Sequence, residues 1–396
     1  MRVLLFTGKG GVGKTTASAA TAAVAAARGH KTLVLSTDPA HSLADALGVP
    51  LTGEPTEVDT GLYAMQVDAQ AAFERTWREI QAYLVDVLAR AGVDALQAEE
   101  LTVLPGAEEV LALLAVREQV ASGLWDLVVV DCAPTGETLR LLALPDALTW
   151  YVEKVFPAQR RALRAVRPLL HRVSGPVVPQ DGVFDAVERL HRQLLDVRAV
   201  LTAPSTSVRL VLTPEAVVVA EARRTLTSLA LYGYRVDGLL ANRVFPSEGD
   251  EDPWRAGWVA AQAEQLDAVR RDAPDLPLRV SPYLPAEPVG LPALVALGDA
   301  LYGDDDPLAP AADADDLLEV QRTTDGFALV LALPLARLEH VQLARTGDEL
   351  VLTVLGHRRV LALPSALRRC VVDGATLTGG RLHVRFTPDP DLWPRT

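Results

Sequence analysis

The stretch RVLLFTGKGGVGKTT, residues 2–16, decides the fold of this chain. An apolar run at residues 3–6 leads into a glycine-rich loop, and a segment rich in alanine begins directly after the loop. A short continuous apolar run is typical of a buried strand, and a small-residue segment of this length is typical of a helix. The order of strand, glycine loop and helix predicts an α/β fold with the loop at the end of its first strand.

The loop matches the pattern G-x-x-x-x-G-K-[ST], which is typical of phosphate-binding loops. Glycines let successive backbone N–H groups turn toward a phosphate, and the N-terminus of the following helix adds a favourable dipole. We expect Lys14 to contact the β- and γ-phosphates, the Thr15 hydroxyl to ligate Mg²⁺, and Thr16 to contact the α-phosphate. The predicted nucleotide-binding residues of the loop are Gly8, Lys9, Gly10, Gly11, Val12, Gly13, Lys14, Thr15 and Thr16.

Further short apolar runs predict the rest of a sheet. They lie at residues 3–6, 32–37, 127–131, 208–212, 236–241 and 277–280, and they alternate with helical patterns. Buried parallel strands have this continuous apolar character, so we predict a doubly wound, mainly parallel α/β domain. Two stretches, 65–120 and 145–203, carry leucines at helical spacing and no strand signal. They are either extra helices that cover the sheet or a helical subdomain with an apolar surface.

The composition changes after residue 303. The segment GDDDPLAPAADADDL is acidic, rich in Ala and Pro, and aperiodic, which predicts a solvated linker at 304–317 between a domain at 1–303 and a second domain at 318–390. In the second domain apolar residues alternate with polar ones, as at Leu350, Leu352 and Val354. Alternation bounded by Gly and Pro predicts antiparallel strands, and hence a small all-β sandwich.

Charge and cysteine content exclude several classes of protein. The net charge of −13 argues against general nucleic-acid binding, which depends on basic side chains. The two cysteines, Cys132 and Cys370, form no C-x-x-C pair, which argues against a cysteine-based zinc site and fits a reducing compartment. The sequence shows neither a secretory signal pattern nor an apolar run long enough to cross a bilayer. We predict a cytoplasmic protein that does not itself span a membrane.

Two aspartates follow predicted strands and complete a site for nucleotide hydrolysis. Asp131 ends the run LVVVD, and open α/β sheets bind ligands at the carboxyl ends of their strands. We expect Asp131 to hold Mg²⁺, through a water molecule. Asp38, in STDPAHSLAD, is expected to orient the attacking water. The alternative for Asp38 is a helix N-cap before Pro39.

Three motifs in this order, KGGVGKT, STDPAHSLAD and DCAPTGETLR, resemble those of the ArsA/GET family of ATPases, within the deviant phosphate-loop class. The resemblance spans residues 1–303 and implies ATP and Mg²⁺ as cofactors and hydrolysis by a homodimer. It implies that Lys9 reaches across the dimer to the partner's nucleotide, so that the predicted catalytic residues are Asp38, Lys9 and Lys14. It also implies that Asn242 pairs with adenine, whereas the alternative for Asn242 is a strand-end residue that caps a turn.

The chain departs from the family pattern at several positions. ArsA repeats its ATPase domain within one chain, whereas this chain has a single phosphate loop, so a two-site assembly would be a homodimer. Cys132 stands where the family usually has threonine, and Glu137 where it commonly has histidine. The chain has two methionines, Met1 and Met65, so the Met-rich client groove of the targeting branch is missing, and leucines would have to form a less plastic one. A single cysteine is also a poor arsenite site, because soft-metal affinity requires several converging thiolates.

The C-terminal segments GFALVLALP and ATLTGGRLHVRF resemble the α-crystallin domain of small heat-shock proteins. The tail TPDPDLWPRT lacks the I-x-I/V motif through which those proteins assemble. The domain is either a client-binding or docking module or a structural appendage.

We predict Mg²⁺-dependent ATP hydrolysis by a nucleotide-gated homodimer that binds and releases an apolar client, such as a segment of a membrane protein. The alternative is the energising subunit of an arsenite or antimonite pump, coupled to a membrane partner. A third possibility, from a different class, is a non-enzymatic chaperone with ATP as a structural ligand.

Overall fold

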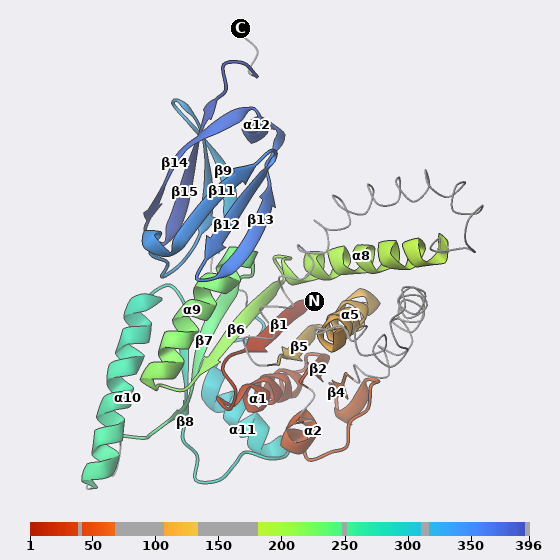
Figure 1. Cartoon of the computed structure of the whole chain (residues 1–396). Coiled ribbons are helices and arrows are strands. Elements are labelled where there is room, and N and C mark those ends of the chain that lie inside the picture. Colours follow the sequence, from red (N-terminus) through yellow and green to blue (C-terminus); the bar gives the residue numbers. More distant parts are fainter. Residues whose placement is uncertain (39–41, 68–106, 134–180, 248–251, 310–316, 393–396) are drawn as a thin grey trace, which may run out of the picture.

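The computed structural model describes the chain apart from residues 39–41, 68–106, 134–180, 248–251, 310–316 and 393–396. Figure 1 shows an α/β domain with a separate β-sandwich standing on one end of it. Both parts of the predicted fold class are therefore confirmed.

The α/β domain is built on an eight-stranded sheet with the order β3-β4-β2-β5-β1-β6-β7-β8. All neighbouring pairs are parallel except β3 and β4. The strands are β1 (Arg2–Thr7), β2 (Thr32–Ser36), β3 (Thr56–Asp59), β4 (Leu62–Gln66), β5 (Leu127–Asp131), β6 (Thr206–Leu212), β7 (Val236–Val244) and β8 (Leu278–Pro282). Every strand predicted from an apolar run is present, and β3 and β4 are additional.

The predicted helical stretch 65–120 begins too early, because Met65 and Gln66 belong to β4. Leu62, Ala64 and Met65 are buried in this strand, so it is as much a core strand as its neighbours. Residues 107–122 of the stretch do form a helix, and residues 68–106 lie outside the described part of the chain. Residues 145–180 of the second predicted stretch also lie outside it.

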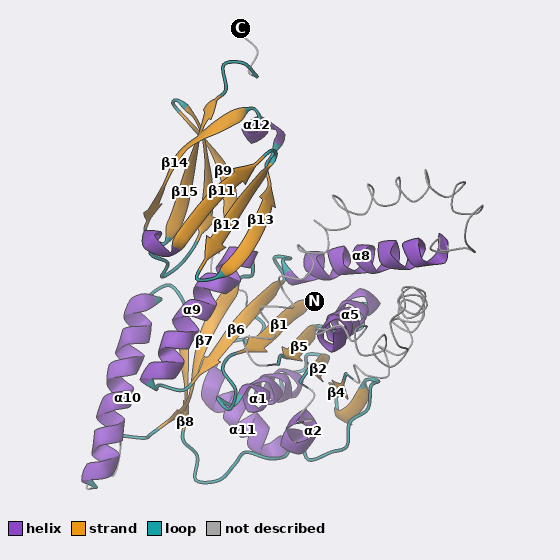
Figure 2. Cartoon of the chain, viewed as in Figure 1, coloured by secondary structure: helices purple, strands orange, loops and turns teal. Residues whose placement is uncertain are grey.

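Helices cover both faces of the sheet (Figure 2). They are α1 (Lys14–Ala27), α2 (Ser42–Leu47), α5 (Ala107–Ser122), α8 (Asp181–Leu201), α9 (Ala216–Tyr232), α10 (Pro253–Asp272) and α11 (Leu291–Tyr302). On one face α1, α2 and α11 pack on Leu4 and Phe6, and on the other α5 and α8 pack on Val3 and Leu5. Successive side chains of a strand point to opposite faces, so the apolar run of β1 supplies both cores.

The β-sandwich consists of a four-stranded sheet, β14-β15-β10-β9, and a three-stranded sheet, β11-β12-β13. Its elements are β9 (Leu318–Thr323), β10 (Gly326–Ala332), a 3-10 turn (Leu338–His340), β11 (Val341–Thr346), β12 (Glu349–Val354), β13 (His357–Ala362), α12 (Ser365–Arg368), β14 (Cys370–Thr378) and β15 (Arg381–Pro388). Leu350, Leu352 and Val354 are buried between the sheets, as their alternation predicts.

The first part of the predicted linker, residues 304–306, is exposed, but it is anchored to the α/β domain. The Asp305 carboxylate lies 3.0 Å from Arg279, and its carbonyl accepts a hydrogen bond from Arg28. The Pro307 carbonyl accepts one from buried Arg209, and Leu308 packs against the α/β core. Asp305, which belongs to this acidic run, thus contacts Arg28 and Arg279, two arginines that are distant in sequence. Residues 310–316 of the linker lie outside the described residues.

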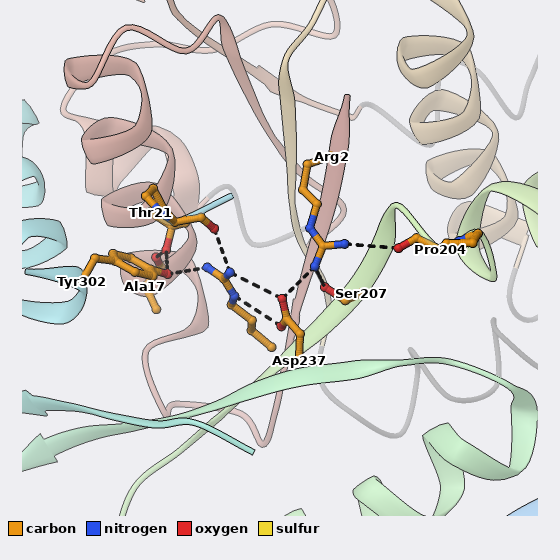
Figure 3. A network of polar contacts seen from close by, with 9 residues as sticks. Arg2, Ala17, Thr21, Pro204, Ser207, Asp237 and Tyr302 are labelled. Atoms are coloured by element: carbon orange, nitrogen blue, oxygen red, sulfur yellow. Dashed lines mark hydrogen bonds and ion pairs between the residues drawn. The ribbon is translucent and has the colours of Figure 1, made fainter. Parts of the chain in front are cut away.

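A buried polar network ties the strands to the helices at the amino-terminal side of the sheet (Figure 3). Asp237 of β7 pairs with Arg2 of β1 at 3.0 Å and with Arg209 of β6 at 3.3 Å. Arg209 also donates to the Tyr302 hydroxyl at 2.7 Å, and this hydroxyl lies 2.8 Å from that of Thr21. Through these contacts, one carboxylate joins β1, β6 and β7, and the second arginine reaches α1 and α11.

None of the helices that the structure describes combines the length and apolarity needed to cross a bilayer.

Candidate functional site

The glycine loop connects β1 to α1 and is closely packed on its neighbours. A Cβ atom on Gly8 would lie 2.1 Å from the carbonyl oxygen of Val211 in β6. Gly13 has a φ of 90°, and a Cβ atom there would lie 2.2 Å from the amide nitrogen of Asn242. Both positions require glycine for space as well as for conformation. The loop is therefore fixed against β6 and the end of β7.

Thr15, Ser36 and Asp131 come together at the carboxyl ends of the strands. The Asp131 Oδ2 atom accepts hydrogen bonds from the Thr15 hydroxyl at 2.9 Å and from the Ser36 hydroxyl at 3.1 Å. The Thr15 hydroxyl also lies 3.1 Å from that of Ser42. Asp131 is level with Phe6 of β1 and with Ser36 of β2 in the parallel register. Sheet pairing thus brings the end of β5 to the start of α1.

The Asp131 carboxyl group is fully buried, and its Oδ1 atom accepts no hydrogen bond from the described part of the chain. Burial raises the pKa of Asp131 to about 6, with a smaller contribution from the charge of Asp38. The hydrogen bonds from Thr15 and Ser36 and the charge of Lys14 act in the opposite direction. A buried carboxylate with one oxygen unsatisfied is ready to accept a cation or a water bound to it.

This donor set fits Mg²⁺. Carboxylate, hydroxyl and water oxygens are its usual ligands, and proteins bind it through one or two side chains together with substrate phosphates. No group of three or more His, Cys, Asp or Glu residues suited to a metal occurs among the described residues. Water and phosphate oxygens are the ligands that usually complete a Mg²⁺ site with so few side chains.

The two loop lysines occupy different environments. Lys14 is buried, and its ammonium donates to the Lys9 carbonyl at 3.4 Å, so it lies along the inside of the loop. The Lys9 side chain is 40% exposed, and its ammonium lies 3.7 Å from the Glu221 carboxylate of α9. Lys14 thus faces the space enclosed by the loop, whereas Lys9 faces the surface.

Asp38 lies just beyond the end of β2 and is half-buried. Its N–H donates to the Ser36 hydroxyl at 3.2 Å, and its carbonyl accepts from the Gln66 amide at 2.7 Å. These bonds hold the backbone of Asp38 at the ends of β2 and β4. Pro39 lies outside the described residues, so the alternative of an N-cap at Asp38 stays open.

Asn242 has its side-chain amide bound to the glycine loop. Its Nδ2 donates to the Val12 carbonyl at 2.9 Å, and its Oδ1 accepts from the N–H of Arg243 at 2.9 Å. Arg243 has a φ of 57° and donates to the Gly11 carbonyl at 3.0 Å. Asn242 therefore supports the glycine loop from near the end of β7, and its alternative role as the cap of a turn stays open. Its pairing with adenine stays a prediction.

A cavity of about 410 Å³ opens beside Asn242. It is lined by Thr16, Asn242, Arg243 and the loop 281–288, together with Leu297. The cavity borders the start of α1, where Thr16 lies, and has room for a nucleoside. The segment PYLPAEPVGLPAL, residues 282–294, contributes its first part to the lining of this cavity.

Ser36, Ser42 and Arg243 were not identified from the sequence. Ser36 could have been found from strand pairing, because a polar residue at the end of β2 faces the end of β5. Ser42 lies within the motif STDPAHSLAD, but its contact with Thr15, like the contact of Arg243 with the glycine loop, is a tertiary contact that the sequence does not indicate.

Cys132 is buried directly after Asp131, and burial raises the pKa of its thiol to about 12. A protonated, buried thiol is a weak metal ligand, since the thiolate is the ligating form. Cys370 is buried in the core of the β-sandwich, far along the chain. Glu137 lies outside the described residues.

Comparison with known proteins agrees with this geometry. Residues 1–303 match the family model of the anion-transporting ATPases, and residues 324–386 match the HSP20-like domain found in ArsA. An uncharacterized protein of Streptomyces coelicolor is 41% identical over the full length of both chains. A putative arsenical pump-driving ATPase of Chlorobaculum tepidum is 35% identical over 98% of this chain and 96% of its own.

The similarity extends to eukaryotes. ATPase GET3B of Arabidopsis thaliana is 32% identical over 74% of this chain and 77% of its own. The family match covers the loop, the strand-end aspartates and the sheet that brings them together, and it decides against a non-enzymatic chaperone. The chain belongs to the ArsA-type anion-transporting ATPase family and is an ATP-hydrolysing enzyme.

Proposed function

We propose that the chain hydrolyses ATP in a Mg²⁺-dependent reaction at the carboxyl ends of β1, β2 and β5. The observation that carries this proposal is the buried Asp131 carboxylate: one oxygen is bound by Thr15, and the other accepts no hydrogen bond from the residues that the structure describes. Thr15 and, through water, Asp131 would hold Mg²⁺, which when bound neutralises charge on the phosphates. Residues 8–13 bind the phosphates through backbone N–H groups, Lys14 binds the β- and γ-phosphates, and Thr16 binds the α-phosphate.

Asp38 orients the attacking water in this proposal. Hydrogen bonds with Ser36 and Gln66 fix the backbone of Asp38, and so limit the positions that its carboxylate can take. The adenine lies in the cavity beside Asn242, whose amide contributes to base recognition.

The active form is a homodimer in which Lys9 of each chain reaches the partner's nucleotide, as an arginine finger does. Exposure of Lys9 beside a single glycine loop supports this arrangement. The nucleotide state gates an apolar client surface, since a ligand shifts an equilibrium only through different affinities for its two states. We place this cycle in the cytoplasm.

Asp38→Ala tests the assignment. We expect hydrolysis to fall by about 10²–10³-fold, because one oriented catalytic charge is lost, while binding of a fluorescent ATP analogue is retained. Asp45→Ala is the matched control, because Asp45 is an exposed aspartate on nearby α2. Hydrolysis by Asp38→Ala at the parent rate would show that another group orients the water.

Mixing two variants tests the role of Lys9. Neither Lys9→Ala nor Lys14→Ala protein should turn over alone, and mixed dimers should regain one working site at most. A Lys9→Ala homodimer with parent activity would remove Lys9 from catalysis.

The alternative function is to drive an arsenite or antimonite pump, and the relatives named as putative arsenical pump-driving ATPases favour it. The buried thiol of Cys132 opposes it, because it offers no accessible thiolate. Steady-state hydrolysis with and without arsenite separates the two functions. Stimulation by arsenite favours the pump, and an unchanged rate favours the client carrier.

A further inference from the structure

The Lys9 side chain pairs with Glu221 of its own chain. The ammonium lies 3.7 Å from the Glu221 carboxylate, and the two side chains are 40% and 31% exposed. Gly8 and Lys9 lie against α9 in a crevice lined by Val218, Glu221 and Ala222. An ammonium held by a carboxylate in its own chain is not available to the nucleotide of a partner. The pair must therefore open before Lys9 can act in the dimer.

The helix that carries Glu221 ends against the β-sandwich. Leu231 is fully buried in the sandwich core together with Leu329 and Leu350. The Thr227 hydroxyl donates to the Pro334 carbonyl at 2.6 Å. Arg359 of β13 donates to the Leu231 carbonyl.

The ring of Tyr232 adds an edge-to-face contact with His357, at 6.2 Å between ring centroids. Figure 1 shows the sandwich standing on this end of α9. Glu221 and Leu231 lie about 15 Å apart along one continuous helix, at 1.5 Å per residue. A displacement of the helix at one end is therefore felt at the other.

We propose that Glu221 positions the Lys9 ammonium in its own chain, and that the β-sandwich, through α9, sets how firmly Lys9 is held. The proposal rests on the proposed role of Lys9 across the dimer, and it gives the C-terminal domain a part in regulating hydrolysis. A partly exposed ion pair such as Lys9–Glu221 contributes little free energy. The pair therefore changes the availability of Lys9 by a few-fold and does not act as an all-or-none switch.

Acylation of lysine in the full-length, nucleotide-free protein, mapped by mass spectrometry, measures the pair directly. The lysines of the sequence are Lys9, Lys14, Lys31 and Lys154, and Lys31, which lies over the rings of Tyr63 and Trp125, serves as the internal reference. Glu221→Gln should accelerate acylation of Lys9 relative to Lys31 by about two- to five-fold, since an amine released from a carboxylate reacts faster. An unchanged ratio would overturn the proposal.

Glu215→Gln is the matched control. Glu215 is exposed at the same end of α9, and its side chain makes no capping hydrogen bond. The substitution Glu215→Gln removes the same charge as Glu221→Gln and should leave the acylation rate of Lys9 unchanged. An equal acceleration by Glu215→Gln would show a general charge effect and would also overturn the proposal.

Thr227→Val tests the part played by the β-sandwich, since it removes the hydrogen bond to Pro334. Ser228→Ala is its control, because the Ser228 hydroxyl is shown bonding only to the Arg224 carbonyl within the same helix. We expect Lys9 in Thr227→Val to react at a rate between those of the parent and Glu221→Gln. A rate equal to that of Ser228→Ala would contradict control by the sandwich.

The dependence of ATP hydrolysis on protein concentration separates this inference from the proposed function. With both correct, Glu221→Gln reaches half-maximal specific activity at an about two- to five-fold lower concentration. Faster acylation with an unchanged concentration profile would leave the Glu221 contact supported and would refute the role of Lys9 across the dimer.

Discussion

The buried Asp131 carboxylate lowers the stability of the folded chain but keeps an oxygen available for a ligand. Its carboxyl group is fully buried, and its pKa of about 6 lies above the ordinary value of 3.8 because burial disfavours the charged form. A difference of about two pKa units corresponds to about 3 kcal/mol. The ionised Asp131 carboxylate therefore destabilises the nucleotide-free chain at neutral pH.

Asp131→Asn should abolish hydrolysis and still raise the melting temperature of the nucleotide-free chain relative to the parent at about pH 7.5. The folded pKa lies above the unfolded one, so protonation stabilises the folded parent as the pH falls through about 6. The advantage of the variant should then shrink toward about pH 5, as measured by calorimetry. A melting-temperature difference independent of pH would show that Asp131 titrates normally.

The sequence revealed the residues of the site that belong to motifs, such as Lys14, Thr15 and Asp131. It did not reveal the roles of Ser36 or Arg243, because these arise from strand register and from a positive φ near the end of β7. For Asn242 the structure shows a bond to the Val12 carbonyl, which no local pattern predicts.

Among the elements, the glycine loop is fixed by contacts with neighbouring strands and not by its own residues alone. Gly8 is pressed against the Val211 carbonyl of β6, whereas Gly10 has no atom within 4 Å of a Cβ built on it. The identical substitution at these two glycines therefore has different consequences.

Gly8→Ala should lower the free energy of unfolding by about 1–3 kcal/mol or more and weaken nucleotide binding, because the loop must move away from β6. Gly10→Ala should stay within about 0.5 kcal/mol of the parent. Thermal unfolding of both variants checks the contrast, and equal losses would contradict the packing described for the loop.

Strand prediction succeeded for the continuously apolar runs and missed β3 and β4, the two strands at one side of the sheet. The runs of β1, β2 and β5 are continuously apolar, whereas β3 is mostly exposed and polar. The strand β4, LYAMQ, lacks β-branched residues and was joined to the helical stretch that follows it.

At the scale of the whole molecule, buried charge joins elements that are far apart in sequence. The Asp237 carboxylate lies between Arg2 and Arg209 (Figure 3). Arg209 also anchors the segment after α11 by donating a hydrogen bond to the Pro307 carbonyl. No local pattern in the sequence indicates this network, since its members are spread from residue 2 to residue 307.

Asp237→Asn should destabilise the chain by about 3–5 kcal/mol, because two guanidinium groups would stay buried without their counter-charge. Asp267→Asn is the control, since Asp267 pairs with Arg270 on the exposed surface of α10. Denaturant unfolding of the two variants measures the difference. Equal, small losses would show that the buried network contributes little.

Activity also depends on the whole molecule and its partner copy, because each chain has one glycine loop, and the Lys9 side chain of that loop is partly exposed. The most direct test is the specific rate of ATP hydrolysis across protein concentrations, with sedimentation in Mg-ATP at each one. The account predicts that the rate rises with concentration and reaches a plateau as dimers form. A chain that sediments as a monomer in saturating Mg-ATP and hydrolyses it at a constant specific rate would contradict the account.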